Sequence, residues 1–403
     1  MSKTKVAVLF GGRSPEHDVS VVSGLQALNA LDGAKYEGFP VYVATDGAWL
    51  VGEPLRNRAN YIPDEAARKS LTRVDLDLSA GKGRLVVRAS GGGFFARKTE
   101  TIDFDVALLA FHGNIGEDGA MQGVFEAAGL PYTGMRTLAS AVLMDKAITK
   151  RALAGRGIAM LPDAIVHRPA TGLIPDKTTL EAALKDMRFP VIVKPAHLGS
   201  SIGVAKADSL DGVQAVLPAI FKFDTTAIIE PFVENLVEYN VAVRRSGGAI
   251  VTSAIEKPKR SSELLDFKTK YMAGGSKKTG GGKQPGASSQ GMLSLTREIN
   301  PKLPVDLEAS IRNWASSAYA AVNGTGAPRI DFLSNEATGE VWLNEINPCP
   351  GSFGYFLWEA AEKPVLFTAL LDQLIEEAKV SHRAAMLPAD PTPVDARLFK
   401  RPS

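Results

Sequence analysis

Oxygen-donor side chains recur at a regular spacing in residues 328–351 of the chain. Arg329 and Asp331 precede a polar turn, and Glu345 and Asn347 follow it. Because side chains alternate across a strand, a β-hairpin here would put these four side chains on one face, together with Leu343 of the second strand. Two carboxylates and an amide suit Mg²⁺ or Mn²⁺ better than zinc, which favours histidine and cysteine. The segment therefore predicts a divalent-cation site, and a solvated hairpin with outward charges is the alternative.

A second charged site is predicted around Lys194, which lies in the apolar run 190–195. The small-residue loop 199–204 follows this run. One fixed cation and several backbone N–H groups together can bind a phosphate. The loop is not a Walker A motif, because no Gly-Lys-Ser/Thr follows it. A lysine with a structural role is the alternative, although an apolar strand without a nearby charge disfavours it.

The elements that would position these sites begin with an open α/β sheet. The apolar run 6–10 leads into a glycine loop and a helical pattern, and a second buried run, 106–111, ends at His112. Loops at the carboxyl ends of parallel strands form one crevice, so Glu16 of the first loop is expected to meet His112 there. The dinucleotide pattern G-x-G-x-x-G is absent, and Glu16 with Asp18 would repel a pyrophosphate but attract a substrate ammonium. A structural turn and a structural histidine are the alternatives.

The composition is that of an ordinary globular protein. The 403 residues include 46 basic and 44 acidic side chains, a formal charge of +2, so no overall field favours nucleic acid or an acidic membrane. The single cysteine, Cys349, excludes an internal disulfide and fits a reducing compartment. The N-terminus lacks the apolar core of a signal peptide, and no run approaches the length of a membrane span. We expect a cytoplasmic protein with no nucleic-acid and no membrane partner.

Together these residues resemble the D-alanine:D-alanine ligases of the ATP-grasp superfamily, over roughly residues 5–375. Each motif by itself is weak, but their order along the chain is specific. The motifs are Gly11-Gly12-Arg13-Ser14 with Glu16, His112-Gly113 with Gly116-Glu117-Asp118-Gly119, Tyr132-Thr133-Gly134, Met144-Asp145-Lys146, Val193-Lys194-Pro195 with Gly199-Ser200-Ser201, Lys270-Tyr271, Arg329 with Asp331, and Glu345 and Asn347 with Pro350-Gly351.

The resemblance implies an ATP-grasp fold, in which an N-terminal parallel α/β domain is followed by two α+β subdomains that enclose the nucleotide. We expect the domains at residues 1–138, 139–235 and 236–380, with a long glycine- and lysine-rich loop at 266–300 and a tail at 381–403. The implied activity is the ATP-dependent joining of two D-alanines through an acyl phosphate, for peptidoglycan precursors. The implied partners are small amino acids and a second copy of the chain, as a homodimer.

The resemblance also implies roles for individual residues. Asp331, Glu345 and Asn347 resemble the ligands of two magnesium or manganese ions beside ATP. The residues that resemble those around the reacting groups are Glu16 at the first substrate's ammonium, Ser200 and Tyr271, which hold Glu16, His112 near the first substrate's carboxylate, and Arg329 and the Gly351 N–H as oxyanion donors. The residues that resemble the nucleotide site are Lys146, Lys194, Ser201, Glu230, Phe232, Val233, Glu238, Lys270 and Leu343.

The chain departs from the family just beyond Gly351. Five positions on, the family usually has a small hydroxyl residue that binds the second substrate's carboxylate, but this chain has Phe356 within the aromatic run 353–358. The run would narrow the acceptor pocket, unless a one-residue slip leaves Ser352 or Tyr355 in that role. A related ligase with a different acceptor amino acid, hydroxy acid or amine is therefore the alternative function. A third reading, a fold kept without turnover, is disfavoured by the retained metal positions.

Overall fold

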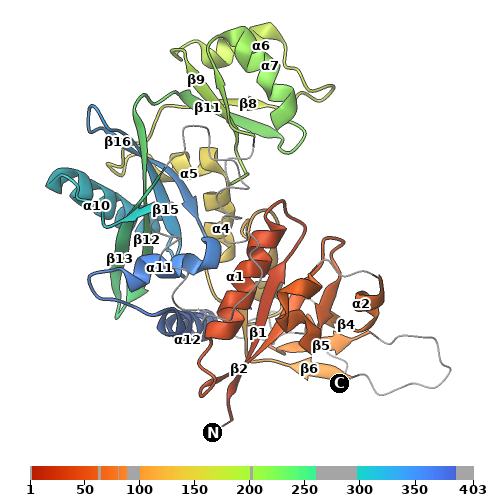
Figure 1. Cartoon of the computed structure of the whole chain (residues 1–403). Coiled ribbons are helices and arrows are strands. Elements are labelled where there is room, and N and C mark those ends of the chain that lie inside the picture. The colour runs from red at the N-terminus through yellow and green to blue at the C-terminus, as the bar shows by residue number, and fades with distance from the viewer. Residues whose placement is uncertain are drawn as a thin grey trace, which may run out of the picture.

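The computed structural model describes residues 2–61, 65–79, 81–88, 100–199, 203–259 and 297–386. Figure 1 shows three β-sheets with helices packed around them. The N-terminal sheet, in red and orange, lies at the bottom of the view, and the central sheet, in green, lies at the top. The predicted mixed α/β architecture is confirmed.

The N-terminal sheet has seven strands in the order β6-β5-β4-β3-β2-β1-β7. The strands β2, β1 and β7 are parallel, and the other pairs are antiparallel. The strands are β1 (Thr4–Gly11), β2 (Tyr36–Val43), β3 (Trp49–Val51), β4 (Thr72–Leu76), β5 (Arg84–Val87), β6 (Thr101–Asp103) and β7 (Val106–Leu109). The helices are α1 (His17–Ala30), α2 (Glu65–Lys69) and α3 (Ala120–Ala127), with 3₁₀ turns η1 (Glu53–Arg56) and η2 (Arg58–Asn60). The loops after β1 and β7 therefore lie side by side at one edge, as predicted.

Two short helices lead into the central sheet, α4 (Thr137–Met144) and α5 (Lys146–Leu153). The side chain of Asp145 caps α5 by accepting the N–H groups of Ala147 and Ile148, which fixes where this helix begins. The central sheet is antiparallel, in the order β10-β9-β11-β8. Its elements are β8 (Ala164–His167), α6 (Lys177–Leu184), β9 (Val191–Pro195), β10 (Ala205–Ala207), α7 (Leu210–Ile220) and β11 (Thr226–Pro231).

The C-terminal sheet has five antiparallel strands in the order β14-β13-β12-β15-β16. The strands are β12 (Leu236–Ser246), β13 (Ala249–Pro258), β14 (Arg297–Ile299), β15 (Arg329–Asn335) and β16 (Val341–Asn347). The helices are α10 (Val305–Ala321), α11 (Tyr355–Glu359) and α12 (Phe367–Ala385), with a 3₁₀ turn η3 (Gly351–Gly354) before α11. The predicted hairpin is the pair β15 and β16, at one edge of this sheet.

The hydrophobic cores show which sheets are packed together. One cluster combines residues of β1, β2, β7 and α1 with residues of η3, α11 and α12. The central sheet has a cluster of its own, made only of residues between 164 and 229. The predicted domain boundaries at 138 and 235 stay predictions. No helix in the described part of the chain is both long and apolar enough to cross a membrane.

Candidate active site

Four polar side chains form one row across the C-terminal sheet. Glu256 of β13 is opposite Asn240 of β12, Asn240 is opposite Asp331 of β15, and Asp331 is opposite Glu345 of β16. Residues directly opposite one another in neighbouring strands point to the same face of a sheet. Glu238 lies two residues before Asn240, on that same face. Four carboxylates and one amide thus lie on one face, where they need counter-charges.

Arg329 supplies one of these charges. Its Nε and Nη2 donate to the two oxygens of Asp331, at 2.6 Å each, and the amide nitrogen of Asn347 donates to Asp331 at 3.0 Å. Burial raises the pKa of Asp331 to about 6, against the lowering effect of the Arg329 guanidinium. The structure therefore brings Arg329, Asp331 and Asn347 together on the hairpin, as predicted.

Lys146 supplies a second charge from the first residue of α5. Its Nζ lies 3.2 Å from a carboxylate oxygen of Glu345 and donates to the Leu198 carbonyl at 2.7 Å. Burial opposes ionisation of Glu345, but Lys146 and Lys194 outweigh it and lower the pKa of this carboxyl. Lys146 and Lys194, which lie 199 and 151 residues before Glu345 in the sequence, thus both stabilise the charge of this one carboxylate.

Lys194 links the central sheet to the C-terminal sheet. Its Nζ lies 2.6 Å from Glu230 of the neighbouring strand β11 and donates to the side-chain oxygen of Asn344 at 2.8 Å. The second oxygen of Glu230 is in contact with Lys150 of α5. Glu230 is buried, and these two lysines lower its pKa in spite of that burial. The segment beyond Glu230 holds Phe232, whose ring faces Lys206 at 4.7 Å, and the buried Val233.

The loops of the N-terminal sheet close the site on another side. A Cβ built on Gly199 would lie 3.5 Å from the Glu16 carboxylate, and one built on Gly113 would lie 2.8 Å from it. Glu16 therefore lies between the loop that follows His112 and the loop that contains Gly199. Burial lowers the pKa of His112 to about 4, so its imidazole is neutral at pH 7.

The backbone around Gly351 is tied to these same loops. Glu117 accepts the N–H of Gly113 at 2.6 Å and the N–H of Cys349 at 2.8 Å. Ser23 accepts the N–H of Ser352 at 2.8 Å, and its hydroxyl oxygen lies 2.7 Å from Nε2 of His112. Burial and the charge of Glu16 raise the pKa of Glu117 to about 8. Two buried side chains, Glu117 and Ser23, thus hold the turn that contains the Gly351 N–H.

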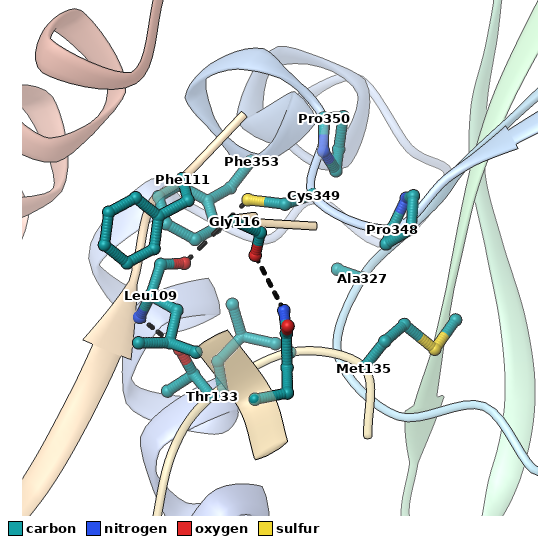
Figure 2. Close-up of a pocket in the computed structure, with 13 residues that line it drawn as sticks. Leu109, Phe111, Gly116, Thr133, Met135, Ala327, Pro348, Cys349, Pro350 and Phe353 are labelled. Carbon is teal, nitrogen blue, oxygen red and sulfur yellow. Dashed lines mark hydrogen bonds between the residues drawn. The ribbon is translucent and has the colours of Figure 1, made fainter. Parts of the chain in front are cut away.

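A small cavity lies directly behind this turn (Figure 2). Its volume is about 20 Å³, and its lining includes Cys349, Pro350 and Phe353 from the turn and Gln122 from α3. Gln122 donates to the Gly116 carbonyl at 2.8 Å, while its buried side-chain oxygen has no donor among the described residues. A space of this size holds about one water molecule. The cavity is therefore too small to be a substrate pocket.

Leu343 does not lie where strict alternation puts it. A bulge in the pairing of β15 with β16 sets Leu343 opposite Phe332, while Glu345 stays opposite Asp331. Leu343 is 1% exposed and packs in the hydrophobic core with Ile346 and Phe332. The prediction that Leu343 shares the face of Glu345 is wrong, because the extra residue of the bulge turns its side chain to the other face. Asn344 contacts Lys194 instead.

The aromatic run after Gly351 is used mostly for packing. Phe353 and Trp358 are buried in the core shared by the N- and C-terminal sheets, and Tyr355 stacks on Phe367 at 4.8 Å. Phe356 is half-buried, with the Arg297 guanidinium 4.4 Å above its ring. Of the aromatic side chains expected to narrow an acceptor pocket, the two buried ones, Phe353 and Trp358, contribute to the core instead.

Four of the predicted site residues lie outside the described residues, namely Ser200, Ser201, Lys270 and Tyr271. Lys150 and Asn344 have contacts in the site that the sequence does not indicate. Lys150 lies four residues after Lys146 on α5, so helical spacing was the one signal that it shares a face with Lys146. Asn344 carried no signal, because the bulge that turns it toward Lys194 is not visible in the sequence.

Family models match most of the chain. The N-terminal model of the D-Ala D-Ala ligases matches residues 5–135, and the C-terminal model matches residues 153–376. The chain belongs to the D-alanine:D-alanine ligase family. The predicted resemblance and the predicted ATP-grasp fold class are confirmed. Members of this family are ADP-forming, ATP-dependent ligases.

Individual ligases match along nearly their whole length. A D-alanine:D-alanine ligase of Chlorobium limicola is 33% identical over 96% of this chain and 99% of its own, and one of Thermosipho africanus is 31% identical over 93% and 92%. The solved D-alanine-D-alanine ligase of Coxiella burnetii has a TM-score of 0.72 at 25% identity and covers 95% of this chain and 96% of its own. The VanG D-Ala:D-Ser ligase of Enterococcus faecalis, at 24% identity, has a TM-score of 0.70 over 94% of this chain and 100% of its own and shows the fold alone.

The chemistry of the donor set fits the divalent cation that ligases of this family generally need. In the described part of the chain no three His, Cys, Asp or Glu side chains already converge as a metal cluster. Asp331 and Glu345 nevertheless lie opposite each other, each beside a side-chain cation. Asn347 donates its N–H to Asp331, so its carbonyl oxygen is the atom that it could offer to an ion. Such oxygen donors suit Mg²⁺ or Mn²⁺.

Proposed function

We propose that this protein is an ATP-dependent D-alanine:D-alanine ligase that forms a dipeptide through an acyl phosphate, for peptidoglycan precursors. The observation that carries the proposal is the paired set of Asp331 with Arg329 and Glu345 with Lys146 on one face of the C-terminal sheet. Anionic and cationic groups alternate there, as a site for a metal-bound polyphosphate requires. The names of the curated relatives support D-alanine as the substrate.

The first half-reaction makes the carboxylate electrophilic. A carboxylate oxygen of the first D-alanine attacks the γ-phosphorus of ATP, the bond to the bridging oxygen breaks, and ADP leaves. Asp331, Glu345 and Asn347 would hold two magnesium or manganese ions, which supply charge neutralisation at the phosphate oxygens. Lys146 and Lys194 would bind those oxygens from the other side. Glu230, Phe232, Val233 and Glu238 would contact the base and ribose.

The second half-reaction forms the peptide bond. The amine of the second D-alanine attacks the carbonyl carbon of the acyl phosphate, phosphate leaves, and the nitrogen loses a proton. Arg329 and the Gly351 N–H would stabilise the oxyanion, and each such donor is typically worth about 3–4 kcal/mol. Glu16 would hold the ammonium of the first substrate, with His112 near its carboxylate. Ser200, Ser201, Lys270 and Tyr271 keep their predicted roles as proposals.

Two further proposals concern the setting of the reaction. We place the enzyme in the cytoplasm, because its reaction consumes ATP, and we propose a homodimer, as the family resemblance implies. A different acceptor has less support than D-alanine. Two aromatic residues of the run after Gly351, Phe353 and Trp358, pack in the hydrophobic core, and the curated relatives reported above carry the D-alanine:D-alanine name.

A substrate panel tests the proposed reaction. Phosphate release is measured with ATP and Mg²⁺ against D- and L-amino acids, hydroxy acids and small amines, and products are identified by mass spectrometry. We expect D-alanine alone to support turnover and to yield its dipeptide. If D-alanine alone gives no phosphate while another pair does, the proposed substrate is wrong.

The variant Glu345→Gln tests the metal-binding face. It keeps the size of the side chain but removes the charge that faces Lys146 and would hold an ion, so we expect turnover to be lost. Glu340→Gln is the matched control, because Glu340 lies in the exposed turn of the same hairpin. Circular dichroism checks that both variants fold. Full activity in Glu345→Gln would show that the metal assignment is wrong.

A further inference from the structure

Three buried side chains form a charge cluster at the proposed nucleotide site. Glu230 of β11 is 3% exposed, Lys150 of α5 is 6% exposed and Lys194 of β9 is 7% exposed. Lys150 contacts one carboxylate oxygen of Glu230, and Lys194 lies 2.6 Å from the other. One carboxylate thus has two cations, although one would neutralise it.

The two lysines differ in what else they contact. Lys194 also donates a hydrogen bond to Asn344, across to the C-terminal sheet. Lys150 donates to the Leu161 carbonyl at 2.6 Å and lies 3.5 Å from Asp163, on the segment just before β8. The segment just before β8 therefore anchors Lys150, while Lys194 bridges the central and C-terminal sheets.

In the proposed reaction Lys194 binds a phosphate oxygen of ATP, whereas Lys150 has no such role. If Lys194 moves to a phosphate oxygen of ATP, it uncovers the second oxygen of Glu230. A buried carboxylate that loses its last cation is strongly destabilised. Lys150 prevents this destabilisation, because it stays beside the first oxygen of Glu230 and keeps the carboxylate charged. The uncovered oxygen is then a charged acceptor that faces the ligand.

We propose that Lys150 is a positioning residue for nucleotide selection: it holds the Glu230 carboxylate as the acceptor for the exocyclic amino group of adenine. The inference rests on the proposed function, since it takes ATP as the nucleotide. A 6-amino purine offers this oxygen an N–H donor. A 6-oxo purine such as hypoxanthine brings a carbonyl oxygen, which a carboxylate repels.

The test measures binding of ATP and of inosine triphosphate to the full chain, with Mg²⁺ and without amino acids, by titration calorimetry. In K150M we expect the dissociation constant for ATP to rise at least 10-fold and the preference for ATP over inosine triphosphate to fall by a similar factor. The variant K150R keeps the charge and should retain most of the preference. K177M is the matched control and should match the wild type, because Lys177 pairs with Asp211 on the surface.

The outcomes separate this inference from a structural role and from the proposed function. Equal losses for both nucleotides in K150M, or wild-type binding of both, would overturn the role of Lys150. If K150M does not fold, K150M/E230Q is compared with E230Q. Equal ATP preference in those two supports the inference, because Lys150 would act only through Glu230, and a further loss of preference in the double variant overturns it. A wild-type chain that binds neither nucleotide contradicts the proposed function itself.

Discussion

At the scale of single residues, the candidate site is a set of buried charges that neutralise one another. Asp331 faces Arg329, Glu345 faces Lys146, and Glu230 faces two lysines. Removing one partner of a buried pair typically costs about 3–5 kcal/mol, because it leaves the other charge without compensation. Charges this costly to bury are retained for binding or catalysis more readily than for stability.

Catalysis should require the planar guanidinium group of Arg329 and not only its positive charge. Lysine keeps the charge, but its single nitrogen cannot donate in parallel to both oxygens of Asp331 and also reach a developing oxyanion. We expect Arg329→Lys to lower kcat about 100-fold or more, the usual effect of losing one oxyanion donor. Steady-state phosphate release measures it. Arg84→Lys, at an exposed pair with Asp103, should leave kcat unchanged, and equal kcat in both variants would contradict the role of Arg329.

The sequence allowed some of these residues to be predicted and not others. Asp331, Glu345 and Asn347 follow from strand alternation and from the chemistry of oxygen donors. Lys150 and Asn344 could not be predicted with their contacts, because their partners lie 80 and 150 residues away in the sequence. Contacts between sheets depend on packing that no local pattern records.

At the scale of elements, the bulge in the hairpin decides which residues face the site. Alternation predicts the face of Glu345 and Asn347 correctly but fails at Leu343, where one extra residue reverses the side-chain direction. The polar turn and the two flanking runs specify the hairpin itself. A bulge leaves no such pattern, because its cause is the fit of β16 against β15.

Leu343→Ala distinguishes a core role from a nucleotide-binding role. Leu343 is 1% exposed within the core of the C-terminal sheet, so the variant leaves a cavity and should cost about 2–5 kcal/mol of stability. We expect a lower thermal midpoint with a KM for ATP within about threefold of the wild type. An unchanged midpoint with a KM raised tenfold would place Leu343 at the nucleotide instead.

The stability of the contact between α5 and the central sheet should depend on pH through His197. Its Nδ1 lies 2.8 Å from Asp224 and its Nε2 lies 3.2 Å from Asp145, the cap of α5. The hydrogen bond to Asp224 is the main cause that raises the pKa of His197 above 6.5, so the stabilisation is complete below pH 6.5 and is lost as pH rises through the folded-state value. Burial opposes ionisation of Asp224, but the contact with His197 lowers the pKa of this carboxyl below 3.8, so Asp224 is ionised throughout the range from pH 5.5 to pH 9.

The measurement is the thermal midpoint of His197→Gln against the wild type between pH 5.5 and pH 9. We expect a difference of about 2 °C at pH 5.5, as for a partly exposed pair worth about 1 kcal/mol, which shrinks toward pH 9. His167→Gln is the control, because that ring lies 3.3 Å from the Thr226 hydroxyl rather than beside a carboxylate. A difference that grows with pH would contradict the predicted stabilisation by protonated His197.

At the scale of the whole molecule, the site lies where separately packed units meet. The N-terminal sheet shares one core with η3, α11 and α12, while the central sheet keeps a core of its own. Lys35 of the N-terminal unit also pairs with Asp372 of α12 at 3.0 Å. The loops around Glu16 and the turn at Gly351 are thus built on one core, and Lys194 and Glu230 on another. The order of the motifs allowed the fold to be predicted through the family resemblance, but this sharing of cores requires the three-dimensional structure.

Two leucine variants should therefore loosen different parts of the molecule. Leu374 of α12 is 4% exposed in the shared core, and Leu217 of α7 is fully buried in the central core. Each alanine variant should cost about 2–5 kcal/mol. Because local opening follows cooperative units, Leu374→Ala should raise hydrogen exchange in both β1 and α12 while β11 stays protected, and Leu217→Ala should do the reverse. Exchange is followed by mass spectrometry of peptides from these three elements. If Leu374→Ala raised exchange in β11 as much as in β1, the two cores would open together. The central sheet would then not be able to move independently of the N- and C-terminal sheets.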